Sequence, residues 1–367
     1  MKRIGVLTGG GDAPGINAVI RGCSLRAESL GLEFIGVRRA WIGLKERDTV
    51  PLDSHVTAHW LGRGGTELRT RRYNPFDEGE EQLILEGFAE LGLDGLVAIG
   101  GDGTLTTCYG LHRLGMPIVG VPKTIDNDIP GTDQTFGFDT AVQAACDAID
   151  RLHTTAAAHG RVLIVEVMGR YAGWIAAYAG IAGDAALVLI PEHPVRLADV
   201  IEWAKGLKQR GREYAILVVA EGALIVRDDG VPLVRGEVTP EGYEKLGGVS
   251  VHLARELMAA GVDARTIILG HIQRGGPPSA FDRMLSLRYG AHAVELLAKG
   301  VSGVMVALSD NHMITVPLAE VAGRRRLFDS ARFDLAWMLP RLPLADGALG
   351  DRSEGAPGDG GGPAADR

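Results

Sequence analysis

The sequence has no long apolar run and very few cysteines. In its 367 residues, no apolar stretch reaches the roughly 20 residues of a transmembrane helix. Residues 1–3 lead straight into a short apolar run, with no signal-peptide pattern. The 3 cysteines, Cys23, Cys108 and Cys146, share no metal-binding spacing. We therefore expect a soluble cytoplasmic protein without a membrane partner, in which the cysteines are small core residues.

Excess positive charge is also absent. The formal charge of −8 argues against a nucleic-acid partner, so an anionic ligand needs a local cluster of basic side chains. The length suffices for two domains with large cores. Glycine is abundant, with 52 residues, roughly twice the usual share. Part of the excess lies in residues 341–367, which offer little apolar surface to bury and which we expect to be disordered.

Short apolar runs alternate with amphipathic helical stretches along most of the chain. Strands are predicted at residues 4–8, 96–99, 117–121, 161–167, 186–190, 215–220, 266–269 and 303–308. Helices are predicted at residues 80–91, from about residue 139, and from about 277 to Gly300. This alternation is typical of an α/β protein with doubly wound, mainly parallel sheets. Residues 223–250 break the pattern, and Asp228-Asp229-Gly230 there predicts the turn of a small hairpin.

The most informative stretch is residues 122–128, Pro-Lys-Thr-Ile-Asp-Asn-Asp, directly after the strand predicted at 117–121. Ligands of open α/β sheets bind at this end of the strands. Residues 100–104, Gly-Gly-Asp-Gly-Thr, follow the strand at 96–99 and should open a helix whose N–H groups can hold a phosphate. Placed on adjacent strands, the two stretches offer a phosphate cradle, a metal-binding aspartate and a base. That combination indicates phosphoryl transfer.

Two further stretches are rich in glycine. Residues 9–15 form a glycine turn after the first strand, which is typical of nucleotide- and phosphate-binding domains. Residues 62–76 form a basic loop with four arginines within ten residues. Most charged runs are solvated surface, but the guanidinium group suits phosphate well. We keep both interpretations of this loop open.

Together these motifs resemble the bacterial 6-phosphofructokinases from Ile4 to about Leu308. The matching motifs, in family order, are residues 9–15, 100–104, 124–128, 168–171 and 270–276. The resemblance implies two similar Rossmann-like domains, with the active site in the cleft between them. Residues 1–137 and 276–302 would form the donor domain, and residues 138–275 and 303–340 the fructose 6-phosphate domain. It also implies Mg²⁺, a role in glycolysis and a homotetramer.

The resemblance assigns roles residue by residue. Asp126 would be the base that accepts the sugar 1-hydroxyl proton, and Asp102, with Asp128, would handle Mg²⁺. The transferring phosphoryl group would be held by Thr124, the N–H groups around Gly10, Arg72 and Arg170. The donor site would comprise Gly10, Arg72, Tyr73, Gly101, Asp102, Gly103, Thr104 and Lys123. The sugar-phosphate site would comprise Thr124, Asp126, Asp128, Arg161, Met168, Gly169, Arg170, Glu221, Arg265, His271 and Arg274, with Arg161 and Arg265 reaching across from a neighbouring subunit.

Two positions give opposite indications about the donor. Lys123 is typical of family members that use pyrophosphate, whereas Gly103 is typical of those that use ATP. A carboxylate at position 103 would block and repel the α-phosphate of ATP, and glycine does neither. We therefore predict ATP, with pyrophosphate as the alternative. The effector pocket of the regulated enzymes is only partly kept, because Arg21 remains but Leu25 and His153 replace expected arginines.

Two other functions remain as alternatives. An NAD kinase would account for residues 100–104 but would leave residues 124–128 and 270–276 without a role. A non-catalytic sugar-phosphate-binding protein would need the arginines but neither Asp126 nor Asp102.

Overall fold

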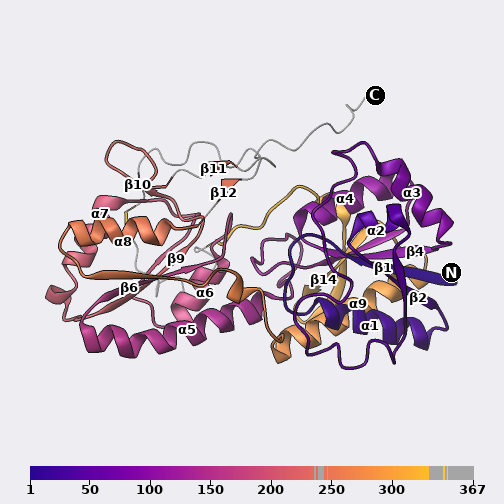
Figure 1. The fold of residues 1–367 in the computed structure, drawn as a ribbon, viewed down its shortest axis with the longest axis horizontal. Coiled ribbons are helices and arrows are strands. Elements are labelled where there is room, and N and C mark those ends of the chain that lie inside the picture. Colours follow the sequence, from indigo (N-terminus) through magenta and orange to yellow (C-terminus); the bar gives the residue numbers. More distant parts are fainter. Residues whose placement is uncertain (235–236, 239–243, 246, 330–341, 344, 346–367) are drawn as a thin grey trace.

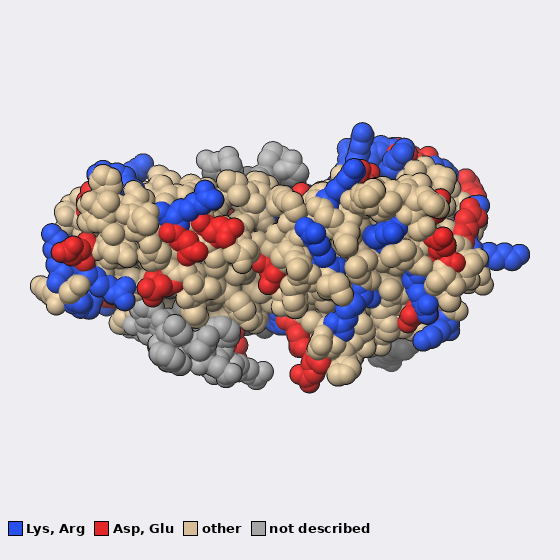
Figure 2. All heavy atoms as spheres, turned by 90° about the horizontal axis from the view of Figure 1, so that it is seen from below, with Lys and Arg blue, Asp and Glu red and all other residues tan. Residues whose placement is uncertain are grey.

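The structure is a computed structural model that describes residues 1–234, 237–238, 244–245, 247–329, 342–343 and 345. It forms two lobes side by side, each a sheet with helices on both faces (Figure 1). Figure 2 shows the molecule from below, where the lobes meet at a narrower waist and basic and acidic side chains are interspersed on both. The predicted α/β class with mainly parallel sheets is confirmed.

The first domain is built on a seven-stranded sheet in the order β15-β14-β5-β4-β1-β2-β3. Its strands are β1 (Arg3–Thr8), β2 (Glu33–Val37), β3 (Thr49–Leu52), β4 (Gly95–Gly100), β5 (Ile118–Pro122), β14 (Val304–Ser309) and β15 (His312–Pro317). Its helices are α1 (Ile16–Ser29), α2 (Trp41–Glu46), α3 (Glu81–Glu90), α4 (Asp102–Arg113), α9 (Ala280–Ala298) and α10 (Leu318–Val321). All of its strand pairs are parallel except β2–β3 and β14–β15.

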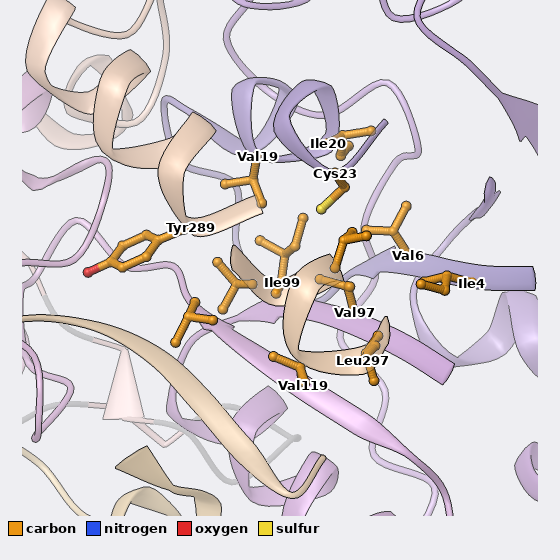
Figure 3. Close-up of a cluster of buried hydrophobic side chains, with 14 of the residues drawn as sticks. Ile4, Val6, Val19, Ile20, Cys23, Val97, Ile99, Val119, Tyr289 and Leu297 are labelled. Carbon is orange, nitrogen blue, oxygen red and sulfur yellow. The ribbon is translucent and has the colours of Figure 1, made fainter. Parts of the chain in front are cut away.

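Alternate side chains of the central strands enter two different cores. Val97 and Ile99 of β4 face α1 and α9, where they pack with Ile20 and Leu297 (Figure 3). Leu96 and Ala98 belong to the core on the opposite face, with residues of α2, α3 and α4. Because both faces are covered, β4 and β5 are buried throughout, which explains why their sequences are continuously apolar.

The second domain has a four-stranded parallel sheet in the order β13-β6-β9-β7. Its strands are β6 (Val162–Val167), β7 (Leu187–Leu189), β9 (Ala215–Ala220) and β13 (Ala264–Ile268). Two short strand pairs lie outside this sheet: β8 (Val195–Arg196) pairs with β10 (Ile225–Val226), and β11 (Glu237–Val238) pairs with β12 (Glu244–Lys245). Its helices are α5 (Phe138–His159), α6 (Trp174–Ala182), α7 (Leu197–Lys205) and α8 (Val249–Ala259), with the 3₁₀ turns η1 (Lys208–Arg210) and η2 (Gly270–Gln273). Helices α5 and α6 cover one face of the sheet, and α7 and α8 cover the other.

The expected division of the chain is wrong for residues 303–321. We assigned them to the second domain, but β14 pairs with β5 of the first domain, Val304 opposite Val119 and Met305 opposite Gly120. Helix α9 carries the chain back to the first domain, and β14 takes the free edge of β5. The chain crosses again only after α10, since Phe328 packs in the core of the second domain.

Several smaller predictions can also be compared with the structure. The hairpin at Asp228–Gly230 is confirmed, because the N–H of Arg227 donates to the carbonyl of Val231 at 2.9 Å. Cys23 and Cys108 are buried, as expected, and Cys146 is half-buried. The disorder expected for residues 341–367 falls mostly outside the described residues. It is wrong for Ala345, whose N–H donates to the carbonyl of Pro194 at 3.1 Å. Within the described ranges, no helix is long and apolar enough to cross a membrane.

Candidate active site

The carboxyl ends of β1, β4 and β5 meet at one edge of the first sheet. These strands are parallel neighbours, so the segments that follow them, residues 9–12, 101–104 and 123–128, lie together. Backbone hydrogen bonds join the segments: Gly9 N–H donates to Ile99 O at 2.8 Å, and Lys123 N–H donates to Gly100 O at 2.9 Å. The two motifs that indicated phosphoryl transfer are therefore adjacent.

The glycine turn after β1 is shaped by Gly10. Its φ of 75° lies in the left-handed region, which a residue with a Cβ rarely adopts. The carbonyl of Gly10 accepts a hydrogen bond from Thr70 Oγ1 at 2.6 Å, so the basic loop at residues 62–76 is anchored to this turn. The loop therefore lies against the site rather than apart from it.

Lys123 extends into the same turn. Its Nζ donates to the carbonyl of Gly11 and lies 3.5 Å from the place of a Cβ on Gly10. Only 4% of Lys123 is exposed. Burial, and then the positive charge of Arg274, lower the pKa of this ammonium to about 8. A buried ammonium group therefore lies where an anion would meet the backbone N–H groups of the turn.

Asp126 lies beside Lys123 in a tightly ordered segment. Its N–H donates to Thr124 Oγ1 at 3.1 Å, and Thr135 Oγ1 donates to Thr124 O at 2.8 Å. Asp126 Oδ1 is buried and has no hydrogen-bond partner among the described residues. Burial, and then the charge of Asp128, raise the pKa of Asp126 to about 7. An unpaired buried carboxylate oxygen is costly, so its presence indicates a site kept for a ligand proton.

The second domain contributes side chains at the ends of β6 and β9. Met168 N–H donates to Gln273 Oε1 at 2.8 Å, which ties the end of β6 to η2, and Gly222 N–H donates to Gly169 O at 3.1 Å, which joins the ends of β6 and β9. The Nε2 of Gln273 is another buried polar atom with no partner in the described part of the chain.

The two domains also interact across the gap between them. Arg274 Nη1 donates to the carbonyl of Asp12 at 3.2 Å, so it reaches the glycine turn of the first domain. Glu221 has its pKa raised by burial, while Arg170 and Arg274 oppose this rise. The charge of Glu221 in turn helps to raise the pKa of Asp126. Carboxylates and cations from the two domains are thus close together at the domain boundary.

Asp102 and Asp128 are candidate ligands for Mg²⁺. Burial raises the pKa of both, and the charge of Asp102 raises that of Asp128 further, so the two carboxylates lie close together. The described residues contain no group of three or more metal-binding side chains. Mg²⁺ does not need one, because it commonly uses one or two carboxylates together with phosphate oxygens and water. The guanidinium of Arg325 lies 3.6 Å from Asp102 Oδ2, which shows that this place suits a cation.

The phosphofructokinase family model matches residues 3–297. The chain belongs to the phosphofructokinase family. A Chloroflexus aggregans protein named ATP-dependent 6-phosphofructokinase is 47% identical over 333 residues, covering 88% of this chain and 91% of that protein. A Streptomyces coelicolor protein named pyrophosphate–fructose 6-phosphate 1-phosphotransferase is 47% identical over 336 residues, covering 90% and 98%. The resemblance inferred from the motifs is confirmed.

Solved structures of the family agree in fold. Saccharomyces cerevisiae phosphofructokinase superposes with a TM-score of 0.76 at 30% identity, over 87% of this chain; the present chain spans 45% of that longer one. A pyrophosphate-dependent phosphofructokinase from Marinobacter aquaeolei gives a TM-score of 0.77 at 23% identity, over 90% of this chain and 86% of that one, which bears on the fold alone.

Some residues expected in the phosphofructokinase site lie elsewhere in this chain. Arg161 and Arg265 each bind Asp263, both at 2.7 Å, at the start of β6 and β13. Met168 lies beyond the other end of β6, about 20 Å away at the usual rise per residue. These arginines therefore cannot reach the candidate active site of their own subunit.

Two other expected residues are exposed, and a third bonds within its own domain. His271 is exposed on η2, and Arg72 is exposed on the basic loop. The hydroxyl of Tyr73 donates to Glu80 Oε2, so its polar end bonds to a side chain of its own domain.

Sequence reasoning missed several residues that organise the site. Thr70, Thr135 and Gln273 position its backbone, and Arg325 faces Asp102. Thr70 lies in the basic loop and Gln273 in the motif at residues 270–276, but neither was given a role, and Arg325 carried a signal in the run Arg324-Arg325-Arg326 of an acidic protein.

The expected effector arginine is engaged within its own domain. Arg21 Nη1 donates to Thr57 Oγ1 at 3.0 Å and to the carbonyl of Ser54. On the second domain, His153 Nε2 lies 2.7 Å from the carbonyl of Gly183.

Proposed function

We propose that this chain is an ATP-dependent 6-phosphofructokinase. It would transfer the γ-phosphoryl group of Mg·ATP to the 1-hydroxyl of fructose 6-phosphate and yield fructose 1,6-bisphosphate, in glycolysis in the cytoplasm. The observation that carries the proposal is Asp126, whose buried Oδ1 has no partner among the described residues. It lies where cations from both domains meet.

In the proposed mechanism, Asp126 accepts the proton of the sugar hydroxyl, and its neighbours bind the negatively charged phosphoryl group. Asp126 accepts the 1-hydroxyl proton, which a carboxyl group with a pKa near 7 can do at neutral pH. Lys123 and the N–H groups of the glycine turn hold the phosphoryl oxygens, and Arg170 supplies positive charge from the second domain. Glu221 binds sugar hydroxyls. Mg²⁺, held by Asp102 and Asp128, would neutralise phosphate charge.

The choice of ATP depends on the space around Gly103. A Cβ added there meets no atom within 4 Å, so the nucleoside side of the donor has room to pass. Lys123 is compatible with either donor, because an ammonium near the phosphates acts as a point charge. Relatives of similar identity carry both names, so the donor must be measured on this protein.

The test is steady-state phosphorylation of fructose 6-phosphate with Mg·ATP and, separately, with Mg·pyrophosphate. We expect faster turnover with Mg·ATP at comparable saturation. Faster turnover with pyrophosphate would support the alternative donor. Binding of fructose 6-phosphate without transfer from either donor would support a non-catalytic sugar-phosphate-binding protein.

The pKa values of Asp126 and Lys123 predict a bell-shaped pH profile. Asp126 is a base only when ionised, so kcat/KM should fall as the pH drops below about 7. Lys123 holds phosphate best when protonated, so kcat/KM should fall as the pH rises above about 8. The substitution Asp128→Asn removes a charge that raises the pKa of Asp126 and should move the acidic limb to lower pH. An acidic limb that stays in place in that variant would contradict this assignment.

We propose further that the enzyme is a homo-oligomer, most simply a tetramer. Strand β13 is an edge strand, and apolar side chains at its end and on η2 are exposed: Ile268 by 49% and Ile272 by 72%. An exposed edge and apolar patch favour pairing with another copy. Arg161 and Arg265 on this side would then reach the cleft of a neighbouring subunit.

Subunit mixing tests this arrangement. Neither the double variant Arg161→Ala, Arg265→Ala nor the variant Asp126→Ser should be active alone. After unfolding and refolding together they should regain part of the activity, because a hybrid site combines an intact Asp126 with intact arginines from the neighbour. Each variant refolded with itself is the control. Wild-type activity in a strictly monomeric preparation would count decisively against the shared site.

A further inference from the structure

After α10 the chain crosses from the first domain to the second as a short strap, residues 322–328 (Figure 1). Arg326 fixes the strap on the first domain: its N–H donates to Asp128 O at 2.7 Å, and its Nη2 donates to Asn127 O at 3.0 Å. The same guanidinium lies 4.5 Å from the ring centroid of Trp174 in the second domain. The strap is therefore tied to both domains.

Phe328 fixes the other end of the strap. Its ring packs edge-on against Trp174 at 5.1 Å, and its N–H donates to Glu192 Oε1 at 2.8 Å. Arg325 lies between Arg324, whose N–H donates to Val321 O at 3.0 Å, and Arg326, so its backbone position is set by contacts other than its own.

The guanidinium of Arg325 is held mainly by Tyr171. Its central carbon lies 3.8 Å from the ring centroid of Tyr171, a close cation–π stack, whereas its Nη2 lies 3.6 Å from Asp102 Oδ2, too far for a good hydrogen bond. A stack uses the face of the guanidinium and leaves its in-plane N–H groups available. The N–H groups at the edge that faces Asp102 therefore form no strong hydrogen bond with that carboxylate.

A cation bound at Asp102 changes the surroundings of Arg325. With a cation held by Asp102, that carboxylate would no longer be available to Arg325, and phosphates of the donor would lie beside the guanidinium. A guanidinium held in this way could form a planar fork on a phosphate, for which arginine is the best-suited side chain. We propose that Arg325 is a further ligand of the donor's phosphates, presented by the strap and oriented by Tyr171. This inference rests on the proposed function, since it requires a phosphoryl donor at Asp102.

Equilibrium binding tests the inference without turnover. The probes are Mg·β,γ-methylene-ATP and Mg·methylenediphosphonate, titrated calorimetrically into wild-type protein, Arg325→Ala and Arg325→Lys. We expect Arg325→Ala to weaken binding of the matching probe about tenfold or more, the usual effect of losing a charged hydrogen bond. Arg325→Lys should regain little of the lost affinity, because lysine can neither form the planar fork on a phosphate nor keep the stack on Tyr171.

Arg324 provides a matched control one residue away. It is exposed and carries the same charge. Arg324→Ala should therefore change the dissociation constant by less than about twofold. Tyr171→Phe should bind like wild-type protein, whereas Tyr171→Leu should show an intermediate loss, since Arg325 remains but is no longer oriented. These variants keep the test decisive if Arg325→Ala does not fold.

A second readout separates a donor ligand from a mere counterion of Asp102. Mn²⁺ alone, measured by electron paramagnetic resonance, should bind Arg325→Ala at least as tightly as wild-type protein, because a competing cation has been removed. Weaker probe binding with undiminished Mn²⁺ binding supports the proposal. Unchanged or tighter probe binding in Arg325→Ala, or an equal loss in Arg324→Ala, overturns it. Failure of wild-type protein to bind either probe would overturn the proposed function as well.

Discussion

Replacing Asp126 with serine should lower kcat by at least about 10²–10⁴-fold, the usual contribution of a general base. Serine cannot accept the 1-hydroxyl proton at neutral pH. Fructose 6-phosphate should still bind, because in the proposed site its phosphate and other hydroxyls would be held by the second domain and by the arginines of a neighbouring subunit. Single-turnover transfer from Mg·ATP gives the rate of the chemical step, and calorimetry gives the affinity for the sugar phosphate.

Asp133→Asn is a suitable control for Asp126→Ser. Asp133 is an exposed carboxylate in the same domain, and its Oδ2 accepts a hydrogen bond from Asp310 N–H at 2.9 Å, which an asparagine oxygen can also accept. This control should keep near-wild-type turnover. Near-normal turnover in Asp126→Ser would remove Asp126 from the mechanism.

The second large effect is expected at Gly103. The substitution Gly103→Asp should lower kcat/KM for Mg·ATP by at least about a hundredfold. A carboxylate there faces the α-phosphate in a partly desolvated site, at a cost of roughly several kcal/mol, and about 1.4 kcal/mol is a factor of ten. Folding should be unaffected, because the position is open and an acidic residue suits the first turn of α4.

Gly103→Ala separates the effect of charge from that of the Cβ alone. Since no atom lies within 4 Å of that Cβ, the alanine variant should use Mg·ATP nearly as well as wild-type protein. Thermal unfolding of both variants checks the fold. Retained ATP use in Gly103→Asp would show that the steric and electrostatic argument about the donor is wrong.

The sequence was sufficient to predict those strands whose position is decided by the local pattern of apolar residues. The predicted strands at residues 4–8, 117–121 and 215–220 correspond to β1, β5 and β9 within one or two residues. Each is an apolar run of strand length bounded by turn residues, because each is buried on both faces of a doubly wound sheet. The strand-end motifs of one sheet could likewise be placed together, since parallel strands align their carboxyl ends.

Long-range placement could not be predicted in the same way. The run at residues 303–308 was correctly predicted as a strand, but its composition does not say which sheet edge it joins, and its true partner β5 lies far away in sequence. Strand β2, Glu33–Val37, was missed because it is short and carries a glycine within it, although Gly31 just before it, with a φ of 66°, is a turn signal. Edge placement is decided by tertiary packing.

The candidate site likewise contains residues whose placement the sequence predicts and residues whose placement it does not. Asp126, Asp102 and Lys123 follow strands, so their neighbourhood could be inferred from the motifs. The partnership of Arg325 with Tyr171 and Asp102 depends on a segment that crosses between domains after α10. No periodicity encodes that crossing, so only the structure reveals it.

The return of the chain through α9 and β14 also sets an order on folding during synthesis. Helix α1 stays uncovered, and β5 keeps an open edge, until residues 280–309 have been made. At ribosomal rates of about 5–20 residues per second, the intervening second domain delays this step on the order of ten seconds. That domain has all four strands of its sheet between residues 162 and 268. The domain encoded later therefore can close its sheet first, while the N-terminal strands, begun earlier, wait for the strand that completes them.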